Sequence, residues 1–109
     1  LVVIVDCNGL QIDGSTAQVG GVEPLDKKFE SFGFNVLKID GHNFDEIEEA
    51  LNTARNTKGV PTAIIAKTVK GKGVSFMENQ VGWHGKATNA EEFEIAINEL
   101  DAQIKELEG

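Results

Sequence analysis

The sequence predicts an α/β protein built on a partial parallel sheet of about three strands, with crossover helices and a C-terminal helix. Three largely apolar runs rich in β-branched residues, at 1–5, 34–40 and 62–66, are typical of strands. Amphipathic segments separate consecutive runs. Because strands joined through helices are arranged most simply side by side, we expect a parallel sheet with right-handed crossovers.

The first expected strand is Leu1–Val5, and Asp6-Cys7-Asn8-Gly9 follows it as a sharp turn. Oxygen-bearing side chains therefore come just after the carboxyl end of a strand, where open α/β sheets bind their ligands. A chain that opens inside a buried strand is expected to be part of a larger domain. The next stretch, 14–22, is rich in glycine and polar residues and predicts a loop.

The first helix is expected to include Pro24 in its first turn and to end at Gly33. Leu25, Phe29 and Phe32 form its apolar stripe, at spacings of four and three residues. The strand at 34–40 follows, with partial alternation of apolar and polar residues.

The second helix is expected to begin after the turn Gly41-His42-Asn43, because Asn43 and Glu46 approach a capping box. Lys58-Gly59 and Pro61 end it before the apolar strand 62–66. Its apolar stripe consists of Phe44, Ile47, Ala50, Leu51 and Ala54.

The segment 67–85 is predicted to be a long loop, and the last helix to begin near Asn89 with a capping box of Thr88 and Glu91. The apolar residues of this helix repeat at heptad spacing, which fits either packing on its own domain or pairing with a partner helix. They are Phe93, Ile97, Leu100, Ile104 and Leu107.

The chain has 109 residues, enough for one domain, and a net charge of −8. Ten Lys and Arg residues against 18 Asp and Glu residues argue against nucleic-acid binding. Cys7 is the single cysteine, so no internal disulfide can form, which fits a reducing compartment. No apolar run approaches the roughly 20 residues of a membrane span. We therefore expect a cytoplasmic protein with neither nucleic acid nor a membrane as partner.

Three short motifs carry groups suited to phosphate or metal chemistry. Asp6-x-Asn8-x-Leu10 offers side-chain and backbone oxygens to a hard cation, or else forms an Asx turn that closes the strand. The lysines of 67–73 lie among glycines and suit a phosphate, or else a solvated basic loop. His84 lies between glycines in Gly82-Trp-His-Gly85, where it can approach an anion closely. The alternative is a loop histidine that has no functional role.

The ordered set of motifs resembles the transketolase family. It consists of Asp-x-Asn-x-x-x-Ile-Asp-Gly at 6–14, Ile-Asp-Gly-His-Asn at 39–43, Pro-Thr-Ala-Ile-Ile-Ala-Lys-Thr-Val-Lys-Gly-Lys-Gly-Val at 61–74 and Trp-His-Gly at 83–85. The resemblance is to the second half of the amino-terminal, thiamine diphosphate-binding domain, or to the separate amino-terminal subunit of split transketolases. It implies that residues 1–109 are the C-terminal portion of such a domain.

The resemblance also implies the cofactor thiamine diphosphate with Mg²⁺ or Ca²⁺. Asn8 matches a metal ligand near the diphosphate, and Leu10 matches the residue whose backbone carbonyl binds the same ion. Ile12 matches an apolar neighbour of the cofactor, and His84 a catalytic histidine that contacts diphosphate and substrate. The implied reaction transfers a two-carbon ketol unit between sugar phosphates in the pentose phosphate pathway, with a transketolase carboxy-terminal subunit or domain as partner.

The chain departs from the family pattern before Asn8. The family's Gly-Asp-Gly segment, whose aspartate is a metal ligand, belongs about thirty residues earlier, but only seven residues precede Asn8 here. The pyrimidine-binding domain, whose glutamate activates the cofactor, has no counterpart either. Since an anionic ligand contributes strongly to a Mg²⁺–diphosphate site, we expect the chain alone to have no transketolase activity.

Two other interpretations fit the same sequence. One is a fragment of a related thiamine diphosphate enzyme, such as a dihydroxyacetone or deoxyxylulose synthase. The other is a non-catalytic α/β association module that binds through its sheet and its last helix. Because an unpaired strand edge favours pairing, a homo-oligomer is expected in either case.

Overall fold

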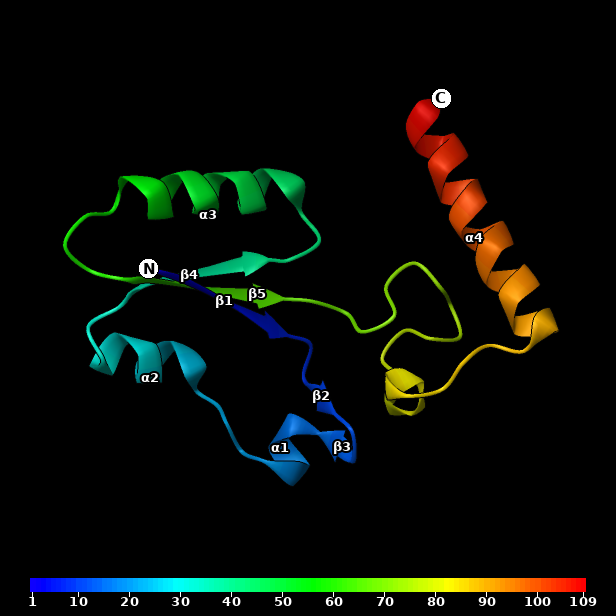
Figure 1. Cartoon of the computed structure of the whole chain (residues 1–109), viewed down its shortest axis with the longest axis horizontal. Helices are drawn as coiled ribbons and strands as arrows, with labels where there is room; N and C mark the ends of the chain where they lie inside the picture. Colours follow the sequence, from blue (N-terminus) through cyan, green and yellow to red (C-terminus); the bar gives the residue numbers. More distant parts are fainter.

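The computed structural model describes residues 1–109. Five strands, four α-helices and one 3₁₀ turn, η1, make up the fold (Figure 1). In chain order they are β1 Val2–Cys7, β2 Leu10–Gln11, β3 Gly14–Ser15, α1 Thr16–Val19, α2 Leu25–Ser31, β4 Asn35–Asp40, α3 Phe44–Asn56, β5 Thr62–Lys67, η1 Val81–His84 and α4 Ala90–Glu108.

The main sheet has three parallel strands in the order β1-β5-β4, which confirms the predicted class and strand direction. From β1 the chain crosses by α2 to the far strand β4, and then returns by α3 to the central strand β5. The first crossover moves across the sheet in one direction and the second moves back in the other. If both crossovers have the usual right-handed sense, their helices must lie on opposite faces of the sheet. Figure 1 shows α3 on one side of the strands and α2 on the other.

The core lies between α3 and the sheet. Ala50 and Ala54 of α3 are 4% and 8% exposed, and they pack on Ile64 of β5 with Leu37 and Ile39 at the border. Two small side chains on one helix face allow α3 to approach the strands closely. The central strand β5 is buried from Thr62 to Ala66, because it has a strand on each edge and a helix on each face.

The expectation that the first strand is buried is wrong, because no residue of β1 is buried and one face of the strand is exposed. On that face Val2 and Ile4 are 45% and 62% exposed, and Leu1, which precedes the strand, is 87% exposed. Ile4 is the register partner of the buried Ile64 and so points to the same side of the sheet. Because β1 is an edge strand and α3 packs over β4 and Ile64 instead, this row of apolar side chains stays open.

Several local expectations differ from the structure. Residues 14–22 were predicted as a loop, but they contain β3, the second strand of the β2–β3 hairpin, and the helix α1. Ser15 is the N-cap of α1. The last helix is capped by Asn89 and Glu92, one position later than the predicted Thr88 and Glu91. Pro24 is the N-cap of α2 and not part of its first turn. Local patterns place helix ends only to within a residue or two.

Two aromatic residues assigned to buried stripes are exposed. Phe32 is 81% exposed because α2 ends before it, and Phe44 is 84% exposed at the start of α3. Phe29 instead packs edge-on against Phe34, with ring centroids 5.2 Å apart. Of the two predicted stripes, only Ala50 and Ala54 of α3 are buried in the core, whereas Leu51 is 42% exposed and α2 has no buried residue.

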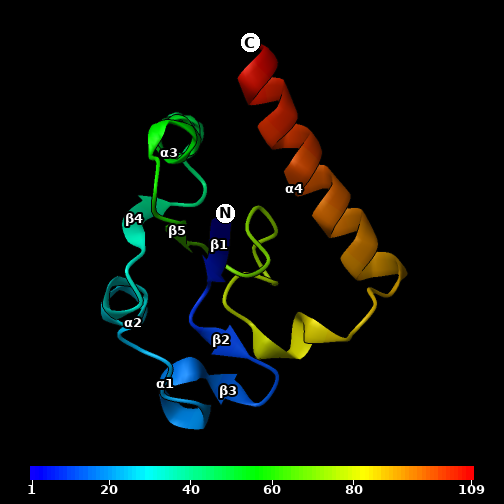
Figure 2. The ribbon, with the colours of Figure 1, turned by 60° about the vertical axis from the view of Figure 1, so that its left-hand side comes forward.

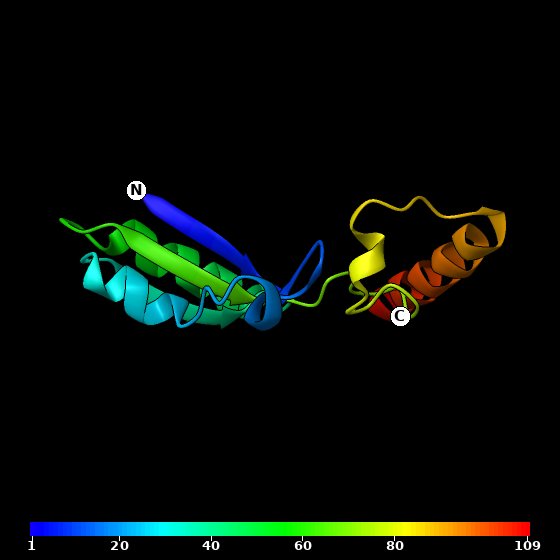
Figure 3. The same ribbon diagram turned by 90° about the horizontal axis from the view of Figure 1, so that it is seen from below.

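The molecule is flat and elongated, with principal extents of 51 × 39 × 16 Å. Its radius of gyration is 16.9 Å, against about 13 Å for a compact domain of this size. Figures 2 and 3 show the reason: α4 lies away from the sheet and meets it only through the segment 68–89. No helix combines the length and apolar character that crossing a bilayer requires.

Candidate functional site

The turn after β1 is a hydrogen-bonded loop centred on Asn8. Its side-chain oxygen accepts the backbone N–H of Leu10 at 2.9 Å, the Asx turn that the sequence offered as one interpretation. Gly9 has φ +74°, and its carbonyl accepts the N–H of Thr16 at 2.9 Å. These bonds fix the path of the chain from β1 into the β2–β3 hairpin. An amide oxygen has two lone pairs, so Asn8 keeps one acceptor position for another ligand.

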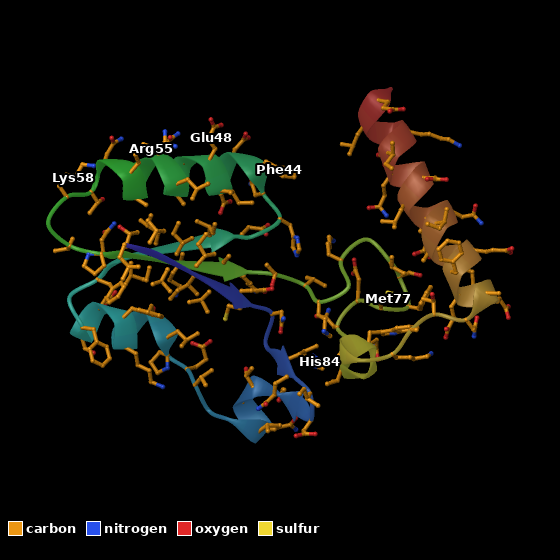
Figure 4. The ribbon with its side chains drawn as sticks, viewed as in Figure 1. Phe44, Glu48, Arg55, Lys58, Met77 and His84 are labelled. Carbon is orange, nitrogen blue, oxygen red and sulfur yellow. The ribbon has the colours of Figure 1, made fainter.

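The same hairpin lies beside the turn that carries the candidate histidine. β2, which contains Leu10, contacts η1, which ends at His84. Figure 4 shows His84 between η1 and the β2–β3 hairpin, and its side chain is exposed. Ile12, at the tip of the hairpin, is 63% exposed. The fold thus brings the regions of Leu10 and His84 together, although 74 positions separate them, while Ile12 lies open at the edge.

The donor set suits a metal that arrives with a diphosphate better than a free metal. Asn8 and Leu10 supply two neutral oxygens, and the protein has no cluster of three or more His, Cys, Asp or Glu side chains placed to hold a metal. A hard divalent cation needs further oxygens, which phosphates commonly provide. There is also room for such a ligand, since nothing lies within 4 Å of the place where a Cβ would stand on Gly9, Gly82 or Gly85.

Side-chain bonds at the carboxyl ends of the three strands hold the next loop in place. The Thr68 hydroxyl donates to Asp6 at the end of β1. The Val69 N–H donates to Nε2 of His42 at 2.8 Å, and the Gly41 N–H donates to the Lys67 carbonyl at 2.8 Å. Sequence reasoning treated His42 only as a turn residue. His42 follows β4 directly, and β4 pairs in parallel with β5, so the segments after the two strands lie close together. This position indicates that His42 can contact the loop after β5.

A groove of about 780 Å³ opens at the same strand ends, on the α2 side of the sheet. Its lining includes Cys7, Glu23, Lys38, His42 and Thr68, but none of Asn8, Leu10, Ile12 or His84. Partial burial raises the pKa of the Cys7 thiol, and a hydrogen bond to Glu23 at 3.4 Å adds to the rise. The neutral thiol therefore persists to higher pH, and the Cys7 side chain is half-buried.

The long loop is folded onto itself and onto α4. The Trp83 indole N–H donates to the Phe76 carbonyl at 3.1 Å, and the two rings are 5.3 Å apart. Lys86 lies 4.1 Å above the Trp83 ring, a cation–π contact. Of the basic residues singled out in the sequence, Lys72 pairs with Glu78 at 3.5 Å. The loop that ends in His84 is thus an ordered structure.

Glu99 of α4 ties the loop to the helix. Its carboxylate accepts the N–H of Ser75 at 2.6 Å and also the Ser75 hydroxyl. These two hydrogen bonds, the hydroxyl first, hold the pKa of Glu99 below its ordinary value of 4.5. Hydrogen bonds to the charged form lower the pKa because protonation weakens them.

Acidification is expected to release this contact. Because the folded-state pKa of Glu99 is depressed, its contribution to stability is complete above pH 4.5 and is lost as pH falls through the lower folded-state value. Hydrogen exchange of the Ser75 amide, measured from pH 6 downwards to about pH 3 and corrected for intrinsic rates, should show protection that collapses on acidification. Glu99→Gln should remove most of this pH dependence.

The matched control for that measurement is Glu94→Gln, because Glu94 lies on the same helix and makes no side-chain hydrogen bond to the loop. The Ser75 profile of Glu94→Gln should match that of the unchanged chain. A Ser75 amide whose protection is insensitive to pH in the unchanged chain would contradict the role given to Glu99.

Comparison with known proteins identifies relatives along almost the whole chain. The family model described as "Transketolase, thiamine diphosphate binding domain" matches residues 1–106. A 6-deoxy-6-sulfo-D-fructose transketolase subunit of a Clostridium species is 40% identical over 103 residues, which are 94% of this chain. One of the apulose-4-phosphate transketolase subunits of Phocaeicola vulgatus is 40% identical over 99% of this chain. In both comparisons the match spans 38% of the relative.

The arrangement of the chain is similar as well. A crystal structure of transketolase from Campylobacter jejuni superposes with a TM-score of 0.81 at 34% identity. The superposition covers 88% of this chain and 15% of that one. Human transketolase is 35% identical over 96% of this chain, a match that spans 16% of the human protein. The shared region is therefore a limited part of each relative.

Proposed function

This chain belongs to the transketolase family by its thiamine diphosphate-binding domain, and we propose that it forms one wall of a cofactor site in a ketol-transferring enzyme. The observation that carries the proposal is the contact between β2 and η1, which gathers Leu10 and His84 around glycines that leave room for a ligand. The family match over residues 1–106 supports the choice of cofactor.

Each candidate residue has a distinct proposed role. Asn8 offers the free lone pair of its side-chain oxygen to Mg²⁺, or to Ca²⁺ in its place, and Leu10 offers its backbone carbonyl to the same ion. His84 donates a hydrogen bond to the diphosphate and faces the substrate, while the exposed Ile12 covers an apolar part of the cofactor. When bound, thiamine diphosphate supplies the nucleophilic carbon that carries a two-carbon unit.

The proposed reaction of the whole enzyme is ketol transfer between sugar phosphates, as in the pentose phosphate pathway, inside the cytoplasm. A carboxy-terminal subunit or domain is the proposed partner. Two relatives of this chain are named as transketolase subunits, which supports an arrangement of separate polypeptides. A homo-oligomeric assembly fits the exposed apolar edge strand β1.

The chain by itself is proposed to be inactive. Asn8 and Leu10 contribute only neutral oxygens, and Asp6 is engaged by the Thr68 hydroxyl. A metal–diphosphate complex must then rely on its own phosphates for charge compensation, so its affinity for this wall alone is expected to be low. A ketol-transfer assay on the isolated chain should give no rate above the uncatalysed one.

Calorimetry with thiamine diphosphate and Mg²⁺ tests the proposal directly. The unchanged chain should bind the pair saturably and should bind Mg²⁺ alone much more weakly. Asn8→Ala should reduce the affinity at least about tenfold, equivalent to about 1.4 kcal/mol. His84→Ala, at an exposed side chain whose loss leaves the fold intact, should also weaken binding.

The matched control is Asn52→Ala, an exposed asparagine on α3 far from the hairpin, which should bind as the unchanged chain does. Equal affinities for Asn8→Ala and the unchanged chain would refute the assigned roles. An absence of binding at millimolar cofactor, together with self-association of the chain, would favour the association module instead.

A further inference from the structure

Two segments that have no role in the proposed function meet at the carboxyl ends of the strands. One is the turn 41–43, which follows β4, and the other is 68–70, which we call the loop root because the loop after β5 starts there. Nε2 of His42 in the turn accepts the backbone N–H of Val69 in the loop root at 2.8 Å. The bond spans 27 positions of the chain and joins the ends of two strands that are neighbours in the sheet.

The turn after β4 holds the imidazole of His42 in one place. The side-chain oxygen of Asp40 accepts the His42 backbone N–H at 2.9 Å, and the Asp40 N–H donates to Glu46 at 2.7 Å. The turn also lies tightly against the loop root, because a Cβ on Gly41 would be 2.6 Å from Cγ2 of Thr68. A larger residue there would push the two segments apart. To accept the bond, Nε2 must carry no proton, so the ring is the neutral tautomer with its proton on Nδ1.

The loop beyond the root closes on itself before η1 begins. The Asn79 N–H donates to the Lys70 carbonyl at 2.9 Å, so the segment 70–79 leaves and returns at the same place. Helix η1 starts shortly after Asn79 and is bonded to this closure, since the Trp83 N–H donates to the Gln80 carbonyl at 3.3 Å. Fixing the loop root therefore fixes the place from which η1 starts.

The bond to His42 is the last hydrogen bond that joins the loop to the strands and their turns. Thr68, just before Val69, is bonded to the end of β1. Beyond Val69, the hydrogen bonds of the loop are internal or go to α4, as the bond between Gly73 and Gln103 does. Since α4 itself lies away from the sheet (Figure 3), its bonds to the loop do not fix η1 relative to the β2–β3 hairpin.

We propose that His42 is a positioning residue of the cofactor site, which keeps η1 and His84 beside the β2–β3 hairpin by holding the loop root. The inference rests on the proposed function, in which His84 and Leu10 bind the same metal–diphosphate ligand. It accounts for the contact between β2 and η1, which Figure 4 shows on the side of His84. His42 acts through the loop and not on the ligand, since it lines a groove whose lining includes neither Asn8 nor His84.

Two variants of His42 separate the hydrogen bond from the ring that makes it. His42→Gln carries an oxygen acceptor at the same number of bonds from Cα as Nε2, whereas His42→Leu removes the acceptor and keeps a side chain of similar bulk. His42 is exposed, so neither change removes core packing. Gln103→Leu is the matched control, because it removes a bond of 2.8 Å to the same loop, but one that comes from α4.

The first measurement is nuclear magnetic resonance of the full 109-residue chain without cofactor. Nuclear Overhauser contacts between β2 and η1 should be present in the unchanged chain, in His42→Gln and in Gln103→Leu, and they should be lost in His42→Leu. The Val69 amide should lose its protection from hydrogen exchange in His42→Leu only. Intact contacts between β2 and η1 in a His42→Leu chain whose Val69 amide is unprotected would overturn the proposal.

The second measurement is calorimetry with thiamine diphosphate and Mg²⁺. His42→Leu should weaken binding about fivefold, the effect of one net hydrogen bond, while His42→Gln and Gln103→Leu should bind as the unchanged chain does. An equal loss of affinity in His42→Leu and either of the other variants would overturn the proposal. If the unchanged chain binds no cofactor but His42→Leu loses the contacts between β2 and η1, the proposed function fails, and the placement of His84 by His42 is supported.

Discussion

Replacing Ile64 by alanine is expected to remove about 2–5 kcal/mol of folding stability, the range for truncating a buried isoleucine. Ile64 is 2% exposed and forms the core with Ala50 and Ala54. Both helix residues are too small to fill the space that the lost side chain would leave. Since only nine of 109 residues are buried, this loss is a large share of what holds the sheet and α3 together.

The control for this substitution is Ile4→Ala. Ile4 is the register partner of Ile64 and has the same chemistry on the same face, but it is 62% exposed. Its truncation should cost less than about 1 kcal/mol. Urea unfolding followed by circular dichroism measures both values, and similar losses for the two variants would show that the core does not lie under α3.

Replacing Gly71 by alanine is expected to displace the loop between β5 and η1. Gly71 has φ +73°, and a Cβ there would lie 2.6 Å from the carbonyl oxygen of Met77 and 2.7 Å from its carbonyl carbon. The left-handed conformation costs a residue with a Cβ about 1–2 kcal/mol. The clash, which is with backbone, should add about 1–3 kcal/mol.

Gly59→Ala separates the two costs. Gly59 has φ +82° but no atom within 4 Å of its virtual Cβ, so this variant carries the conformational cost without the clash. Trp83, whose indole is bonded to the Phe76 carbonyl within the loop, reports the local change by fluorescence. We expect altered Trp83 emission and the larger stability loss in Gly71→Ala only. Equal effects in the two variants would contradict the close approach of Gly71 and Met77.

These two substitutions affect the candidate site differently. Ile64 supports the sheet whose strand ends carry Asp6 and Thr68, so its loss weakens the whole platform. Gly71 shapes the loop that leads to His84 and leaves the turn at Asn8 in place. Cofactor calorimetry on Gly71→Ala would therefore measure how much of the affinity depends on the position of η1.

Much of the architecture followed from local patterns. The apolar run 62–66 predicted a strand, and the stripe through Ala50 and Ala54 predicted an amphipathic helix; both predictions are confirmed. The end of the stripe at Phe44 was wrong, because a periodic pattern does not show where the covering surface stops. The roles proposed for Asn8, Leu10, Ile12 and His84 came from motifs, and they remain predictions.

The sequence by itself determined the parallel α/β class, the helix before the third strand and the family, since periodicity and ordered motifs are properties of neighbouring residues. Only the tertiary structure decided that Leu10 and His84 lie in one region, that His42 holds the loop at Val69, and that β1 is an open edge. These features depend on contacts between residues distant in the chain. No local preference encodes them, because they arise when strand order and crossover direction place separate segments side by side.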